Sequence, residues 1–232
     1  MTPVPATATR LGRRGPRSRQ ASPGFEHLRL RDRIKTGVRV LFVGINPGVR
    51  SALTGHHFAG FSNRFWKLLA ESGLVPEPIG FEEDHRLPEF GFGITNLIPR
   101  PSPGINDLVP AEYVEGWKRL DRKIARYRPE VVALVGVTLY RAIEPLIAGE
   151  VDKKTRAAMR SRAIAPGPQP AAIHGARIFV LPNPSGRNAN FSYAEMLSAF
   201  KGLRRFINRG TKSRWGEKAR HRRVRGRSPP DH

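Results

Sequence analysis

The 232-residue chain contains no cysteine, so it cannot form disulfides, thiolate zinc sites or cysteine-held iron–sulfur clusters. It has no apolar run close to the roughly 20 residues that span a bilayer. The N-terminal segment lacks the apolar centre of a secretory signal. Strings of the GxGxxG and GxxxxGK[ST] types, which cradle nucleotide phosphates, are absent as well. We therefore expect a cytoplasmic protein, nucleoid-associated if it is bacterial, that does not contact a membrane.

Acidic residues are scarce, because 19 Asp and Glu stand against 41 Lys and Arg and give a formal net charge of +22. Residues 1–23 hold five Arg and no acid, and residues 209–232 hold nine Lys or Arg beside two acids. This surplus favours a polyanionic partner such as nucleic acid. The composition of the two ends predicts a disordered basic arm at 1–23 and a disordered basic tail at 209–232, around one domain at 24–208. The ends are either merely solvated or add affinity for DNA.

Apolar runs of strand length alternate with segments of helical spacing. Strands are predicted at 38–44, 92–98, 129–136 and 176–186, and their apolar character indicates burial in a parallel sheet. Helices are predicted at 62–73, 111–127, 138–149 and 193–207, whereas the Pro-rich segment 150–172 is predicted to be a loop or a partly ordered excursion. This alternation predicts an α/β three-layer sandwich with a mainly parallel, roughly four-stranded central sheet.

Two of these strands end in an Asn-Pro turn, at Asn46-Pro47 and at Asn183-Pro184. The carboxyl ends of parallel strands share one edge of the sheet, so both turns should face the same crevice. An amide such as that of Asn46 cannot act as a general base, but it can orient a water molecule. That suits cleavage of an N-glycosidic bond, because the sugar passes through an oxocarbenium-like state that needs little nucleophilic push. The alternative is that the turn only closes a strand.

Four stretches carry a more specific signal. They are GINPG (44–48), TGHHFAGFSNRFWKLL (54–69), GITNLIPRPSPGINDL (93–108) and LPNPSGRNANF (181–191). In this order, over residues 38–207, they resemble the mismatch-specific uracil/thymine DNA glycosylases, the Mug/TDG branch of the uracil-DNA glycosylase superfamily. The resemblance implies a uracil-DNA glycosylase-like fold with residues 24–208 as the glycosylase domain, and an enzyme that uses no cofactor or metal.

The resemblance also implies roles for residues around the first turn. Asn46 matches the catalytic asparagine that positions the attacking water, and Phe58 matches the aromatic residue that stacks on the extruded base. Ile45 matches a residue whose backbone contacts the base. Ser51 matches a pocket position that bears on whether the thymine methyl fits, and Asn63 matches a residue that supports the pocket.

The second turn matches the motif that grips the DNA backbone near the flipped nucleotide, and it comprises Asn183, Pro184, Ser185 and Gly186. Arg187 then stands where the family places the wedge residue that fills the vacated stack, with an ordinary phosphate contact as the alternative. Asn183 stands where faster uracil-excising branches carry a histidine. This implies slow chemistry that relies on a good leaving group.

Other polar residues carry weaker signals. Asn96, at the end of the second predicted strand, is placed to contact the base or the sugar. His56 and His57 are adjacent and lack a carboxylate at ligand spacing, so no metal site is predicted. The acidic run 82–84 is predicted to lie in a solvated loop. The RPSPG run at 100–104 is placed to touch a phosphate.

Taken together, these features predict a monofunctional DNA glycosylase that flips and excises uracil, and by extension thymine or damaged pyrimidines, from mismatches with guanine. The expected partner is double-stranded DNA, and the expected state is a monomer that initiates base excision repair. The alternative is a non-catalytic basic nucleic acid-binding protein on the same scaffold, since charge alone suffices for binding that ignores sequence.

Overall fold

The computed structural model describes residues 24–150 and 152–225, and within them the chain forms a five-stranded sheet with the order β2-β1-β3-β5-β4. The strands are β1 (Val40–Gly44), β2 (Phe92–Asn96), β3 (Val131–Val135), β4 (Gly167–Ile173) and β5 (Ala176–Leu181). β1 pairs in parallel with β2 and β3, and β3 pairs in parallel with β5. β4 runs antiparallel to β5. The expected α/β architecture with a mainly parallel sheet is therefore confirmed.

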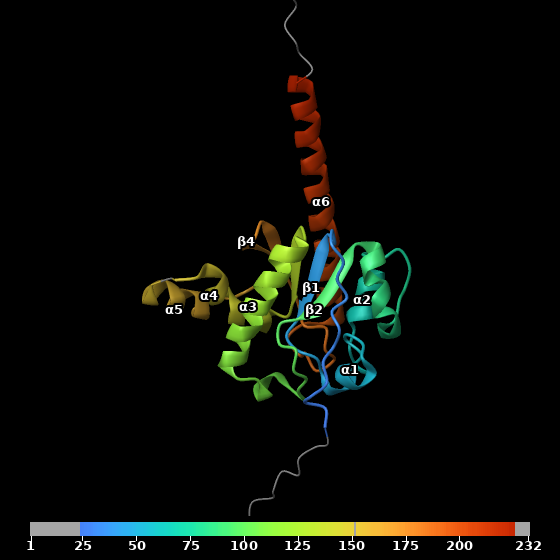
Figure 1. Ribbon diagram of the computed structural model, residues 1–232, viewed down its shortest axis with the longest axis vertical. Coiled ribbons are helices and arrows are strands. Elements are labelled where there is room, and N and C mark those ends of the chain that lie inside the picture. The colour runs from blue at the N-terminus through green and yellow to red at the C-terminus, as the bar shows by residue number, and fades with distance from the viewer. Residues whose placement is uncertain (1–23, 151, 226–232) are drawn as a thin grey trace, which may run out of the picture.

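Helices cover both faces of the sheet (Figure 1). Because successive strand residues point to opposite faces, Phe42 of β1 joins one buried cluster and Leu41 joins the other. The first cluster includes residues of α2 (Phe65–Glu71) and α6 (Tyr193–Arg225), and the second includes residues of α3 (Pro110–Tyr127) and α4 (Val137–Ala148). The structure also contains α1 (Val49–Thr54) and α5 (Lys153–Ser161), with 3-10 helices η1 (Phe81–Phe90) and η2 (Ile105–Asp107).

The segment 150–172 is more regular than the loop or partly ordered excursion that the sequence predicted, because it contains α5 and most of β4. Pro168 and Pro170 lack an amide hydrogen and therefore argue against a strand inside a sheet. β4 lies at the edge, however, where only one side needs hydrogen-bond partners. Its register with β5 shifts between Gln169 and Ala172. The sheet thus has five strands where the sequence predicted about four.

The opposite edge strand, β2, is covered by the chain that precedes β1. The N–H of Arg33 donates to the carbonyl oxygen of Ile94 at 3.0 Å, and the N–H of Ile94 donates back to Arg33 at 2.9 Å. This short antiparallel bridge satisfies the outward-facing backbone groups of Ile94.

α6 runs to Arg225, past the bound at 207 that the sequence predicted. Its last described buried apolar side chain is Ile207, and the sequence beyond lacks apolar spacing but is rich in Arg and Lys, which are good helix formers. Residues 1–23 and 226–232 lie outside the described residues, so the division into basic arm, domain and basic tail stays a prediction. In the described part of the chain, no helix has both the length and the hydropathy that a bilayer crossing needs.

The parallel strands bring their carboxyl ends to one edge of the sheet. β1 ends at Gly44, two residues before Asn46, and β5 ends at Leu181, two residues before Asn183. β2 ends at Asn96 itself. Both Asn-Pro turns and Asn96 therefore meet at the same edge, as the sequence predicted.

Candidate active site

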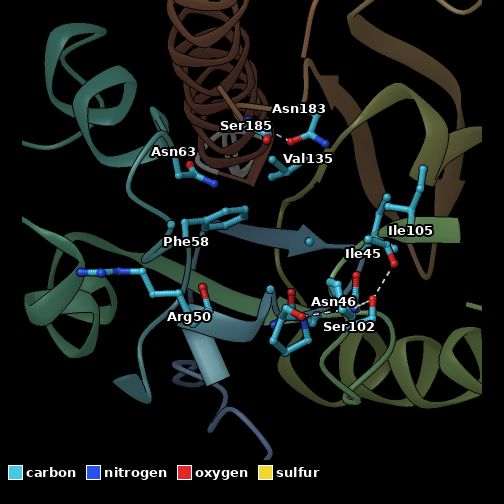
Figure 2. Close-up of a pocket in the computed structure, with 18 of the residues that line it drawn as sticks. Ile45, Asn46, Arg50, Phe58, Asn63, Ser102, Ile105, Val135, Asn183 and Ser185 are labelled. Atoms are coloured by element: carbon cyan, nitrogen blue, oxygen red, sulfur yellow. Dashed lines mark hydrogen bonds between the residues drawn. The ribbon is translucent and has the colours of Figure 1, made fainter. Parts of the chain in front are cut away.

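A pocket of about 240 Å³ opens at this carboxyl edge (Figure 2). Most of the residues that the sequence analysis singled out line it, namely Ile45, Asn46, Ser51, Phe58, Asn63 and Asn96 with Asn183, Ser185 and Arg187. Pro184 and Gly186 do not line the pocket, but they lie in the same turn. The structure thus brings the two turns to one cavity, while the role of each residue stays a prediction.

The side chain of Asn46 is held through its amide nitrogen. Nδ2 donates to Oγ of Ser102 at 2.8 Å and to the carbonyl oxygens of Pro47 and Arg100, each at 3.2 Å. The Ser102 hydroxyl is buried and donates in turn to the carbonyl oxygen of Gly104 at 2.6 Å. Among the described residues, none donates a hydrogen bond to Oδ1 of Asn46. This oxygen is therefore left as an acceptor in the pocket.

Phe58 supplies an aromatic wall. Its ring stacks on Phe65, with centroids 4.2 Å apart and an interplanar angle of 18°, and it projects toward the cavity (Figure 2). Its backbone has a φ of 52°, which costs a residue other than glycine about 1–3 kcal/mol. A Cβ on Gly44 would lie 2.6 Å from Oδ1 of Asn96 and 3.5 Å from the Phe58 ring. Gly44 is thus the residue that lets both side chains close over the end of β1.

A buried carboxylate holds the segment that leads into Phe58. Asp84, in η1, accepts a hydrogen bond from the backbone N–H of His57 at 3.0 Å and from Nε of Arg33 at 3.0 Å. Its oxygens also lie 3.2 Å and 3.1 Å from Nδ1 of His56 and His57. The predicted solvated loop is therefore wrong for Asp84, which is fully buried. Both histidines contact this carboxylate.

The pKa of Asp84 follows from two opposed effects. Burial raises the pKa of the carboxyl group, but the hydrogen bonds from His57 and His56 outweigh burial and lower the pKa to about 2. Asp84 is therefore ionised at neutral pH. It is a structural anion beside the pocket, since it is absent from the pocket lining.

Ser51 and Asn63 line the pocket and also fix the chain that follows Phe58. The buried Oγ of Ser51 accepts a hydrogen bond from the N–H of Ala59 at 3.0 Å. Oδ1 of Asn63 accepts one from the N–H of Phe65 at 3.0 Å, at the start of α2. These contacts show how both residues position Phe58, and contact of either with a base stays a prediction.

Asn96 is half-buried and lies against Gly44. Among the described residues, none forms a hydrogen bond with its side-chain amide. The amide therefore presents both a donor and an acceptor to the pocket. Ile45 also lines the pocket, and its carbonyl oxygen accepts from the N–H of Ile98 at 2.8 Å.

The second turn is held by hydrogen bonds within itself and by contacts with residues 55–64, the loop that contains Phe58 (the Phe58 loop). Oδ1 of Asn183 accepts from the N–H of Ser185 at 3.1 Å, and the carbonyl oxygen of Pro184 accepts from the N–H of Arg64 at 2.9 Å. A Cβ on Gly186 would lie 2.5 Å from Cβ of Ser62. The two loops thus pack backbone against backbone.

Arg187 extends across the mouth of the pocket. It is exposed, and its Nη2 donates to the carbonyl oxygen of Pro103 at 3.3 Å. This contact joins the second turn to the segment that also holds Ser102, the anchor of Asn46.

Several pocket residues were not singled out from the sequence, among them Arg50, Ser102 and Ile105. Ser102 lies in the RPSPG run, where a phosphate contact was expected. Its contact with Asn46 spans 56 residues, so no local pattern could reveal it. Arg50 is one of many arginines in a basic chain, and Ile105 is one apolar residue in a loop, so neither carried a signal.

The lining residues of the pocket include no carboxylate and no imidazole, and their only charged side chains are Arg50 and Arg187. Within the described ranges, no three His, Cys, Asp or Glu side chains gather closely enough to hold a metal ion. The arrangement can accept a hydrogen bond from a water, stack on a planar ring and hold an anion. Those abilities suit departure of an anionic leaving group from a sugar better than attack by a strong nucleophile.

Residues 32–204 match the family model described as the Uracil DNA glycosylase superfamily. The match covers all five strands and every candidate site residue named above.

Proposed function

The chain belongs to the uracil DNA glycosylase superfamily, and we propose that it is a monofunctional enzyme of the Mug/TDG branch that removes uracil from mismatches with guanine in double-stranded DNA. Membership itself indicates DNA glycosylase activity on uracil. The observation that carries the proposal is a single pocket that contains both Phe58 and Asn46, whose amide oxygen is left open as an acceptor. Excision of this kind initiates base excision repair.

The base must first leave the duplex, because its glycosidic bond is hidden within the stack. Extrusion costs roughly a few kcal/mol, and the cost is lowest for a mismatched base. Phe58 offers one ring face for stacking, and its own ring is fixed from behind by Phe65. The amide of Asn96 can donate to a uracil carbonyl oxygen and accept from its N3–H.

Asn46 then orients the attacking water. Its nitrogen is committed to Ser102 and two carbonyl oxygens, so its Oδ1 is the atom that accepts a hydrogen bond from water. The bond between the sugar and uracil breaks, and the uracil leaves as an anion with the bonding electrons. Water adds to the sugar carbon and releases a proton to the solvent or to the departing uracil anion. No strong base is required, because the oxocarbenium-like sugar is itself highly electrophilic.

The mismatch preference is assigned to Arg187. To fill the gap left by the extruded base, its guanidinium must leave the carbonyl oxygen of Pro103 and enter the duplex. There it can donate hydrogen bonds to the O6 and N7 acceptors of the orphan guanine. Asn183, Pro184, Ser185 and Gly186 hold Arg187 at this position by gripping the DNA backbone.

The uracil preference over thymine is assigned to the wall near Ser51. Its hydroxyl is held against the N–H of Ala59, so it cannot swing away to admit a methyl group. A methyl group in such a slot gives only about 1–3 kcal/mol of discrimination. We therefore expect slower, not absent, excision of thymine.

The test is single-turnover excision from labelled duplexes that carry G·U, G·T or A·U, with cleavage at the abasic site by hot alkali. The G·U duplex should react fastest. Asn46→Ala should bind the G·U duplex but lose roughly hundredfold or more in rate, because the positioned polar group is gone. Ser102→Ala should lose less, since Asn46 retains two of its three anchors.

Each arm of this experiment can contradict the proposal. DNA binding without any release of uracil by the wild-type protein would favour the non-catalytic nucleic acid-binding alternative. Equal rates on G·U and G·T would refute the uracil preference, and full activity of Asn46→Ala would refute the assigned role of Asn46.

A further inference from the structure

Arg50 is a cation at the rim of the pocket that has no described counter-ion. It lies in α1 and lines the pocket. Its Nε donates to the carbonyl oxygen of Ala59 at 2.6 Å. Among the described residues, no carboxylate forms an ion pair with it, and neither Nη atom has a hydrogen-bond partner. The guanidinium is thus half-buried, and neither its charge nor its two Nη groups are paired with a described residue.

An exposed aromatic ring holds the same guanidinium from one face. The central carbon of the Arg50 guanidinium lies 3.5 Å above the centroid of Phe61. Phe61 is 91% exposed. Stacking covers the face of the guanidinium and leaves its N–H edge free. With Nε fixed on Ala59, the orientation of that edge is set before any ligand binds.

The pair lies beside the surface assigned to DNA. Phe61 precedes Ser62, and Ser62 packs against Gly186 of the second turn. Figure 2 shows Arg50 on the far side of Phe58 from Asn183 and Ser185. The stacking ring of the pocket is therefore flanked by the second turn on one side and by Arg50 on the other.

We propose that Arg50, held on Phe61, binds a phosphodiester of the uracil-containing strand next to the flipped nucleotide. This inference rests on the proposed function. A nucleotide whose base occupies the pocket carries a phosphate on each side of its sugar, at the mouth of the pocket. The planar fork of a guanidinium matches two phosphate oxygens, and an arginine without a counter-ion loses no ion pair on binding.

The experiment separates this role from that of a loop brace, because Arg50 also fixes Ala59 and Phe61. Affinity is measured as a function of salt for a G·U duplex whose uridine carries a 2′-fluorine, which destabilises the oxocarbenium-like state and prevents excision during the titration. Arg50→Gln should bind about tenfold more weakly, and the slope of log K against log salt should fall by about 0.9, the value for one phosphate contact.

Three further variants serve as controls. Arg50→Lys keeps the charge but loses the stack, so it should keep the wild-type slope, whereas a mere brace would make it resemble Arg50→Gln. Phe61→Leu should weaken binding with the slope unchanged. Arg126→Gln removes another arginine that stacks on an aromatic ring, since the central carbon of its guanidinium lies 5.4 Å from the centroid of Tyr127. Arg126 lies in the last turn of α3, shortly before β3 begins at Val131, and therefore at the amino ends of the strands. The pocket lies at their carboxyl ends, so this variant should keep the wild-type affinity.

The contacted phosphate is located by replacing single phosphates around the uridine with neutral methylphosphonates. One replacement should weaken the wild-type protein but leave Arg50→Gln unaffected. An unchanged slope in Arg50→Gln, or losses that add at every phosphate, would overturn the proposal. If the wild-type protein excises uracil from a natural G·U duplex but either of these two results is found, only the further inference is wrong. Failure of the wild-type protein to release uracil would instead count against the proposed function.

Discussion

At the scale of single residues, the structure separates groups that face the pocket from groups that hold those groups in place. Asp84 is the clearest holding group, because it is fully buried, contacts Arg33, His56 and His57, and does not line the pocket. Phe58, which follows His57 in the chain, has an unfavourable backbone conformation with a φ of 52°. The contacts of Asp84 and the stack on Phe65 offset that strain.

Asp84→Asn should therefore destabilise the fold in a pH-dependent way. The pKa of Asp84 falls from an ordinary value of 3.8 to about 2 on folding, so the stabilisation is complete above about pH 4 and is lost as the pH falls through 2. At pH 7 the variant should lose about 2 kcal/mol in the free energy of unfolding. This loss should shrink between pH 4 and pH 2, because the wild-type carboxylate is then protonated.

Urea unfolding at pH 7 and pH 3 measures the effect, and Glu82→Gln is the matched control because Glu82 is an exposed carboxylate in the same 3-10 helix. Equal stability of Asp84→Asn and the wild-type protein at pH 7 would show that the carboxylate does not hold the loop.

At the scale of elements, the pocket depends on two loops that follow parallel strands and pack against each other. The N–H of Arg64 donates to Pro184, and Gly186 approaches Ser62 so closely that a side chain has no room between them. The Phe58 loop and the second turn therefore form one unit, although they are more than 100 residues apart in the chain.

Gly186→Ala should disrupt that unit. The new Cβ would lie 2.5 Å from Cβ and 2.7 Å from the backbone oxygen of Ser62, so backbone must move. We expect a loss of about 1–3 kcal/mol in stability, the usual cost of overpacking, together with slower excision because Arg187 is displaced. Gly48→Ala is the stability control, since a Cβ there meets nothing within 4 Å. Thermal unfolding of both variants decides the matter, and equal melting temperatures would contradict the packing argument.

The strands, the shared edge and the meeting of the two Asn-Pro turns could be predicted because each leaves a local pattern of apolar runs and turn residues. β4 could not, because its prolines are acceptable only at a sheet edge, and edge position is a tertiary property. Asp84 could not, because a run of three acids is usually solvated, and its burial depends on partners 27 to 51 residues away. Ser102 could not, because its contact with Asn46 spans 56 residues. Arg50 could not, because its contacts with Ala59 and Phe61 depend on how the intervening loop folds.

At the scale of the whole molecule, charge is distributed well beyond the pocket. Residues 1–23 and 209–232 together carry +12 of the +22, and the remaining body still carries +10. In α6 the last described side chain of the buried core is Ile207, so residues from 209 onward add charge without adding to the described core. We therefore expect the two ends to add long-range attraction to DNA, while the pocket in the body recognises the base.

Deletion of residues 1–23 and 209–232 should weaken binding to any duplex and flatten the dependence of binding on salt, since each lost phosphate contact lowers the slope by about 0.9. The single-turnover rate at saturating DNA should stay close to that of the full chain, because no pocket residue is removed. Titrations at several salt concentrations measure the slope. A truncated protein with the full wild-type slope would show that the ends do not contact DNA.

Both edges of the sheet carry features that hinder strand addition. Along β4, Pro168 and Pro170 have no amide hydrogen to offer an incoming strand, and at β2 the outward N–H and carbonyl of Ile94 are already taken by Arg33. A strand of another molecule that approached either edge would therefore lack backbone partners at these positions. The sheet is for this reason a poor template for extension from one copy of the chain to the next.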